Sequence, residues 1–100
     1  MRRLTTPTHI FNIPFETDLI EKMRIVYAQN EEIILTKELS DCVLSDKSVS
    51  VTLTQEETYL FDNKKHAVEI QLHILTTGGD SVVSNIIRVL VEKCLDTEVL

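Results

Sequence analysis

Residues 66–75 read HAVEIQLHIL, and inside this stretch apolar and polar side chains alternate at a period of two. The apolar members are Val68, Ile70, Leu72 and Ile74, and the polar members between them are Glu69, Gln71 and His73. Successive side chains of a β-strand point to opposite faces of a sheet, whereas a helix repeats its apolar residues every three or four positions. The stretch therefore predicts a strand with one face in a core and the other face in water.

Three other segments are typical of strands. Ser48–Thr54 alternates valine or leucine with serine or threonine, a pattern that is hard to reconcile with a helix. Glu32–Glu38 contains a short aliphatic run, and His9–Ile13 ends at Pro14, which has no amide hydrogen to donate to a sheet. We predict a strand in each of the three.

The apolar residues of two further segments fit both a helix and a strand. In Leu19–Tyr27 the β-branched and aromatic end, followed by the turn-like Gln29–Asn30, favours a hairpin. In Ser81–Cys94 the apolar residues repeat at helical spacing, but many are β-branched, and the glycine-containing segment Thr76–Asp80 before them is typical of a hairpin turn. We predict strands in both, and a helix remains the alternative for Ser81–Cys94.

The segment Thr54–Gln55–Glu56–Glu57 is a capping box, in which the first and last residues hydrogen-bond each other's amides. It predicts one short helical turn near Gln55–Phe61, placed across the end of the sheets. About seven short strands separated by turns, with one such crossing, predict an all-β fold of the immunoglobulin-like β-sandwich type.

The length of 100 residues and the mass of 11.4 kDa allow one hydrophobic core, so we expect a single domain over residues 1–100. We expect residues 1–6 and 96–100 to be flexible. No segment approaches the about 18 apolar residues of a membrane-spanning helix, and Met1–Arg2–Arg3 does not lead into a signal-peptide core. We therefore expect a cytoplasmic chain without a membrane partner.

The charge balance argues against nucleic acid as a partner. The chain has 10 basic and 16 acidic residues, a formal net charge of −6, which opposes attraction to phosphates. Arg2–Arg3 and Lys64–Lys65 are its basic doublets, and two doublets do not make a basic stripe.

No residue pattern indicates a metal, a cofactor or a catalytic group. Cys42 and Cys94 lie far apart without a CxxC motif, so we expect two free thiols, and the three histidines lack metal-ligand spacing. The carboxylate pair Glu31–Glu32 is typical of a solvated turn, and Glu56–Glu57 belongs to the capping box. We therefore expect no enzyme activity, no metal and no cofactor.

The last predicted strand offers a candidate interface. If it alternates, Ile87, Val89 and Val91 face the core, and Ile86 and Leu90 face outward. Exposed aliphatic side chains on a sheet exterior indicate a protein–protein interface, unless the C-terminal tail covers them. Ile86 and Leu90 are the candidate interface residues.

The run Leu53–Thr58 followed by Phe61, then Val68–Leu72, a glycine turn and Ser84, resembles small proteins encoded among the virion genes of tailed phages and prophages of Gram-positive bacteria. It is also similar to the immunoglobulin-like N-terminal modules of phage baseplate proteins. The resemblance spans about residues 5–95. It implies the fold and a virion-associated setting, with synthesis in the bacterial host cytoplasm, and it implies no particular catalytic or binding residue.

Together these observations predict a non-enzymatic structural or adaptor module of a phage or prophage particle in the tail, baseplate or head. Its partner would be a second copy or a larger virion protein. The alternative is a ligand-binding β-sandwich, most plausibly for carbohydrate. Such sites stack sugars on exposed aromatic rings, and the chain has no tryptophan and only Tyr27 and Tyr59 as tyrosines.

Overall fold

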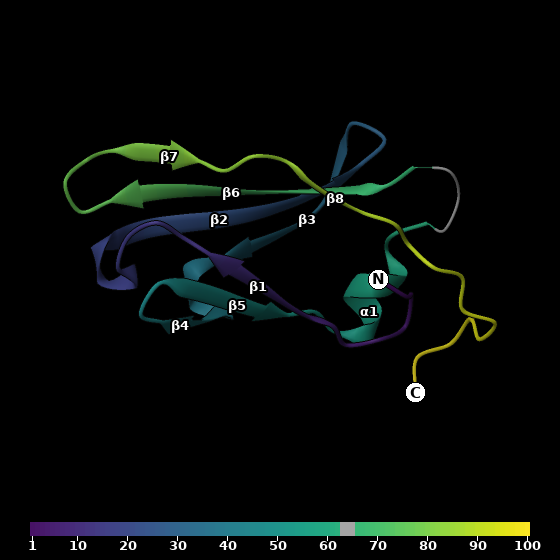
Figure 1. The fold of residues 1–100 in the computed structure, drawn as a ribbon. Helices are drawn as coiled ribbons and strands as arrows, with labels where there is room; N and C mark the ends of the chain where they lie inside the picture. Colours follow the sequence, from purple (N-terminus) through teal and green to yellow (C-terminus); the bar gives the residue numbers. More distant parts are fainter. Residues whose placement is uncertain (63–65) are drawn as a thin grey trace.

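A computed structural model of the chain, which describes residues 1–62 and 66–100, is a sandwich of two antiparallel sheets (Figure 1). Its strands within these residues are β1 (Thr8–Asn12), β2 (Ile20–Gln29), β3 (Glu32–Glu38), β4 (Cys42–Ser45), β5 (Ser48–Thr52), β6 (Val68–Thr76), β7 (Ser81–Val83) and β8 (Ile87–Val89). The helical elements are α1 (Gln55–Tyr59) and the 3₁₀ turns η1 (Thr17–Leu19) and η2 (Leu39–Asp41).

The strand order matches that of an immunoglobulin-like sandwich. One sheet has the order β1-β5-β4, and the other has the order β3-β2-β6 with β7 and β8 both on the far side of β6. These orders correspond to strands B-E-D and C′-C-F-G of immunoglobulin-like domains, with β7 and β8 sharing the last position. In the described residues no strand pairs with the outer edge of β1, where strand A lies in the constant-type domain. The predicted fold class is confirmed.

The strand predicted in Leu19–Tyr27 is confirmed. β2 pairs with β3 through a two-residue turn in which Asn30 and Glu31 both have positive φ, the geometry of a type I′ hairpin. Met23, Ile25 and Tyr27 are buried at alternate positions of β2. The helical reading failed because both neighbours of β2 are strands, and burial of one face of the sheet selects the period of two.

The segment Ser81–Cys94 contains no helix, but its predicted single strand is divided into β7 and β8. The physical reason is Ser84, whose hydroxyl accepts a hydrogen bond from the Leu72 amide while its own amide donates to the Leu72 carbonyl. The Ser84 side chain thus accepts the hydrogen bond from β6 that a backbone carbonyl of a neighbouring strand would otherwise accept. The chain leaves the sheet there and rejoins it at Ile87.

The predicted capping box is present. Thr54 and Glu57 hydrogen-bond each other's amides, and α1 crosses one end of the sandwich (Figure 1). Glu57 also forms an ion pair with Lys37 of β3, and both side chains are mostly buried. Thr58 is fully buried and exchanges two hydrogen bonds with the backbone of Thr5. The short helix is therefore attached both to a sheet and to the N-terminal segment.

The core lies between the two sheets and is built from alternate residues of the four strands β1, β2, β5 and β6 and from residues that flank strands. Its buried members are Phe11, Ile13, Ile20, Met23, Ile25, Tyr27, Val49, Val51, Leu53, Phe61, Val68, Ile70, Leu72, Ile74 and Val91. The apolar faces predicted for Ser48–Thr54, His9–Ile13 and residues 66–75 are all part of it. Residues 1–3 lie beside residues 90–93, with Arg2 and Glu92 joined as a parallel bridge and as an ion pair.

A buried glutamine anchors the crossing between the sheets. Gln29, at the end of β2, donates through its side-chain nitrogen to the carbonyls of Asp62 and His66 at 2.8 and 3.0 Å. Its side-chain oxygen accepts from the Asp62 amide at 2.9 Å. One amide group thus holds the chain both after α1 and before β6, so the approach to the longest strand pair is fixed by a polar contact inside the molecule.

Replacing Gln29 with Leu should lower the free energy of unfolding by about 1–3 kcal/mol, because it removes three hydrogen bonds at a buried position. Gln71→Leu is the matched control, since Gln71 makes one side-chain hydrogen bond, to the Ser84 carbonyl. Urea unfolding of both variants tests this. Equal destabilisation by the two substitutions would contradict the anchoring role of Gln29.

Candidate functional site

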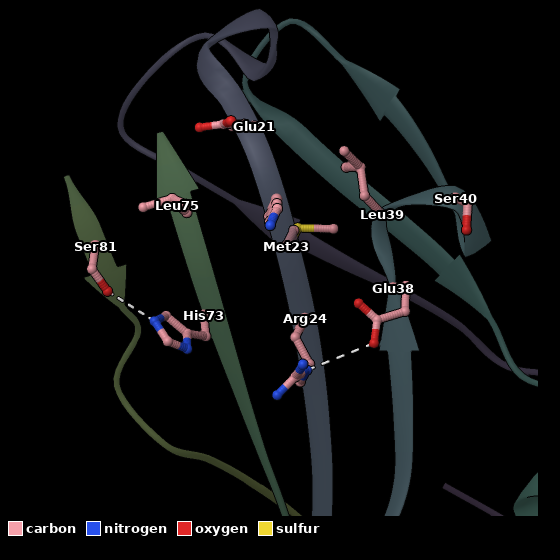
Figure 2. A pocket seen from close by; sticks show the side chains of 10 residues that line it. Glu21, Met23, Arg24, Glu38, Leu39, Ser40, His73, Leu75 and Ser81 are labelled. Atoms are coloured by element: carbon pink, nitrogen blue, oxygen red, sulfur yellow. Dashed lines mark hydrogen bonds and ion pairs between the residues drawn. The ribbon is translucent and has the colours of Figure 1, made fainter. Parts of the chain in front are cut away.

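The surface has a pocket of about 760 Å³ at one end of the larger sheet, shown in Figure 2, and several charged residues line it. It is lined by residues of β2, the end of β3 with η2, and the hairpin of β6 and β7. Arg24 and Glu38 form an ion pair across it at 3.6 Å, and the His73 Nε2 and Ser81 Oγ atoms lie 2.8 Å apart. One ion pair and one hydrogen bond therefore link neighbouring strands in this pocket.

This pocket lacks the arrangement that nucleophilic catalysis uses. A serine beside a histidine is activated when a third group orients the imidazole and donors await an oxyanion. In the part of the chain that the structure describes, no carboxylate hydrogen-bonds to His73, and Ser81 and His73 are both exposed. Among the same residues no three His, Cys, Asp or Glu side chains are grouped as metal ligands. The contact is a cross-strand hydrogen bond on a solvated face.

The second hollow is an apolar groove of about 540 Å³ between the edge of β1 and the edge formed by β7 and β8. Its lining contains no Asp, Glu, Lys or Arg, although 26% of the chain is charged. The lining residues are Ile10, Phe11, Asn12, Ile13, Pro14, Phe15, Leu72, Ile74, Val82, Val83, Ser84, Asn85 and Ile87. An uncharged hollow between two strand edges is suited to protein contact rather than to a polar ligand.

The groove exists because the smaller sheet is too narrow to cover the larger one. Val82 is in register with Ile74, and Ile87 with Ile70, so both point to the inner side of their sheet. The two β6 residues are buried, yet Val82 is 37% and Ile87 is 43% exposed. Beyond β1 the described chain supplies no strand to lie over them.

The two candidate interface residues lie beside this groove rather than in it. Ile86 is 46% and Leu90 is 71% exposed, and both flank β8, while Val91 is buried. At that exposure the C-terminal tail does not cover Leu90. We call the exposed aliphatic residues of this side of the molecule the apolar edge surface: Ile10, Val82, Val83, Ile86, Ile87 and Leu90.

Sequence reasoning missed the β1 side of this surface. Ile10 is 64% exposed on β1, and Val82 and Val83 are exposed on β7. One signal was available, since residues 4–15 contain no Asp, Glu, Lys or Arg. Strands at the edge of a sheet usually carry charged residues when they face only water, so a charge-free edge strand indicates contact with another part of a protein.

His9 is the one titratable side chain of β1, and it faces inward. Its Nδ1 atom lies 2.8 Å from the hydroxyl oxygen of Tyr27. The Tyr27 side chain is fully buried, and its ring contacts that of Phe61 in a tilted arrangement with the ring centres 6.0 Å apart. Burial lowers the pKa of His9 from its ordinary value of 6.5, and the positive N-terminus lowers it further. Burial also raises the pKa of Tyr27, so the pair is held neutral.

This pair makes stability depend on pH. Because the folded pKa of His9 lies below the unfolded value of 6.5, the unfolded chain binds the proton first as the pH falls. The free energy of unfolding should therefore decrease as the pH is lowered through 6.5, and the loss should level off below the folded pKa. His9→Gln should flatten this slope, as measured by urea unfolding at a series of pH values.

His73→Gln is the control, because it leaves the contact between His9 and Tyr27 in place. A slope that is the same in the wild type and in His9→Gln would show that His9 does not cause the pH dependence.

Neither cysteine forms a disulfide in the structure, and burial raises the pKa of the Cys42 thiol.

No helix in the described residues is long and apolar enough to cross a membrane. Comparisons with protein-family models, curated proteins and solved structures found no match to this chain.

Proposed function

We propose that this protein is a non-enzymatic structural or adaptor module of a phage or prophage particle that acts through protein–protein contacts. The observation that carries the proposal is the apolar edge surface, in which four exposed aliphatic residues line an uncharged groove and Ile86 and Leu90 are exposed on either side of β8. Covering an exposed aliphatic side chain contributes about 1.5–3 kcal/mol when burial is complete. A few such residues are enough to favour association.

The particle setting rests on the resemblance of Leu53–Thr58, Val68–Leu72 and Ser84 to small virion-associated proteins. A chain of this kind would be made in the bacterial host cytoplasm and then join the particle. Its net charge of −6 also favours protein partners over nucleic acid.

The carbohydrate-binding alternative has less support from the aromatic residues. Tyr27 is fully buried, and the Arg3 guanidinium lies 4.2 Å from the centre of the Tyr59 ring. Tyr27 therefore offers no face on which a sugar could stack, and one face of the Tyr59 ring is already in contact with Arg3.

The test is incorporation into particles. Prophage induction in the bacterium that encodes this chain, gradient purification of the released particles and mass spectrometry should detect the wild-type protein. Leu90→Lys should remain folded, because the new charge stays in water in the free protein, and should be depleted at least about tenfold from particles since docking would desolvate it.

Two controls separate docking from folding. Leu95→Lys changes an exposed leucine outside the apolar edge surface and should be incorporated like the wild type. Val89→Lys places a charge opposite the buried Val68 and should lower the melting temperature. The proposal fails if the wild type is missing from particles or if Leu90→Lys is incorporated normally.

A further inference from the structure

The outer edge of β1 is an open site for strand pairing. β1 pairs with β5 on one side, and no described residue pairs with its other side. Beyond the strand ends, the Ile13 amide donates to the Lys47 carbonyl and the Leu53 amide donates to the Pro7 carbonyl. In an antiparallel ladder this places residues 8, 10 and 12 at positions whose own N–H and C=O groups point away from β5.

This edge lacks the protection that edge strands usually have. Exposed edges are commonly blocked by charged side chains, prolines within the strand or bulges. β3 carries Glu32, Lys37 and Glu38, and β8 carries Arg88. The other outer strand of the smaller sheet, β4, is also uncharged, but it is only four residues long. The charge-free residues 4–15 include all of β1, and its prolines lie just outside it, at positions 7 and 14.

The outward groups of β1 are symmetric about Ile10. If two copies align antiparallel with Ile10 opposite Ile10, Thr8 of each lies opposite Asn12 of the other. Every one of these residues then meets a residue whose N–H and C=O groups also point outward, so the edge satisfies its own hydrogen-bonding groups. No like charges meet, which matters for a chain with a net charge of −6.

We propose that β1 pairs antiparallel with β1 of a second copy of this chain, with Ile10 at the twofold axis. The inference rests on the proposed docking function and names its partner. The pairing joins two three-stranded sheets into one of six strands. It covers Ile10 with its own symmetry mate and brings the second copy alongside the groove, where Val82 and Ile87 lack cover.

The second copy is the occupant that fits these observations best. An isologous interface requires a surface that is complementary to itself. The β1 edge meets this requirement in hydrogen bonding, in charge and in the central aliphatic contact. β1 also forms one side of the groove, so the groove lies next to the proposed interface.

The test is sedimentation equilibrium of the wild type over a broad concentration range, where we expect a dimer. Ile10→Pro removes an outward N–H but no hydrogen bond to β5, and should weaken the dimer about tenfold to a hundredfold. Ile10→Thr keeps both outward backbone groups and β-branching, so it should remain a dimer. Thermal unfolding checks that each variant is folded.

A charge exchange tests the register independently of proline. Ile10→Lys and Ile10→Glu should each be monomeric, because like charges would meet at the twofold axis. An equimolar mixture of the two should form a heterodimer, detected by sedimentation and native mass spectrometry. This rescue is expected only if residue 10 of one copy lies beside residue 10 of the other.

The possible failures are distinct. A wild type that stays monomeric overturns the pairing; if Ile10→Pro then also loses incorporation into particles, the edge belongs to another virion protein. A dimer that survives Ile10→Pro but dissociates in Leu90→Lys overturns pairing through β1 while docking stands. A dimer with the expected charge rescue that never enters particles supports the pairing and removes the particle function.

Discussion

The antiparallel pairing of β2 with β6 is the interaction on which the other elements depend. It runs from Gln29 opposite Val68 to Ile20 opposite Thr76, and its inner residues, such as Ile25 and Leu72, are almost completely buried. β3 attaches to one side of this pair, and β7 and β8 attach to the other. Alternation on two adjacent strands forces one face of the sheet to be apolar, and that face requires a second sheet.

The second sheet meets this requirement incompletely, and the candidate site is the result. Three strands lie over a sheet that is four positions wide, so inward-pointing side chains at the β7 and β8 edge keep contact with water. The same deficit leaves β1 as an outer strand. The exposed aliphatic groups along the groove and the unpaired backbone of β1 therefore have one cause, and the groove lies between β1 and the edge formed by β7 and β8.

The alternating segments could be predicted because a period of two survives in any sheet that buries one face. β6 and β5 were predicted in this way. β2 was predicted from its β-branched and aromatic residues before the turn at Gln29–Asn30, and the cap of α1 was predicted from Thr54 and Glu57. β4 was missed because its four residues include exposed Val43 and Leu44 and do not alternate. The division at Ser84 depends on one hydroxyl meeting the backbone of β6, which no local pattern encodes. For the site, Ile86 and Leu90 were found by alternation within one strand, whereas Ile10 and the groove depend on how the two sheets align.

The strand order has a consequence for folding. β1 pairs with β5, β2 pairs with β6, and Arg2 pairs with Glu92, so early segments find partners that are synthesised much later. Pairings between distant segments form slowly because a long loop must be closed before any contact is gained. During synthesis the apolar β1 and β2 segments therefore emerge before β5 and β6 exist. Until β5 and β6 have been synthesised, the apolar side chains of β1 and β2 lack their partners and are exposed to aggregation.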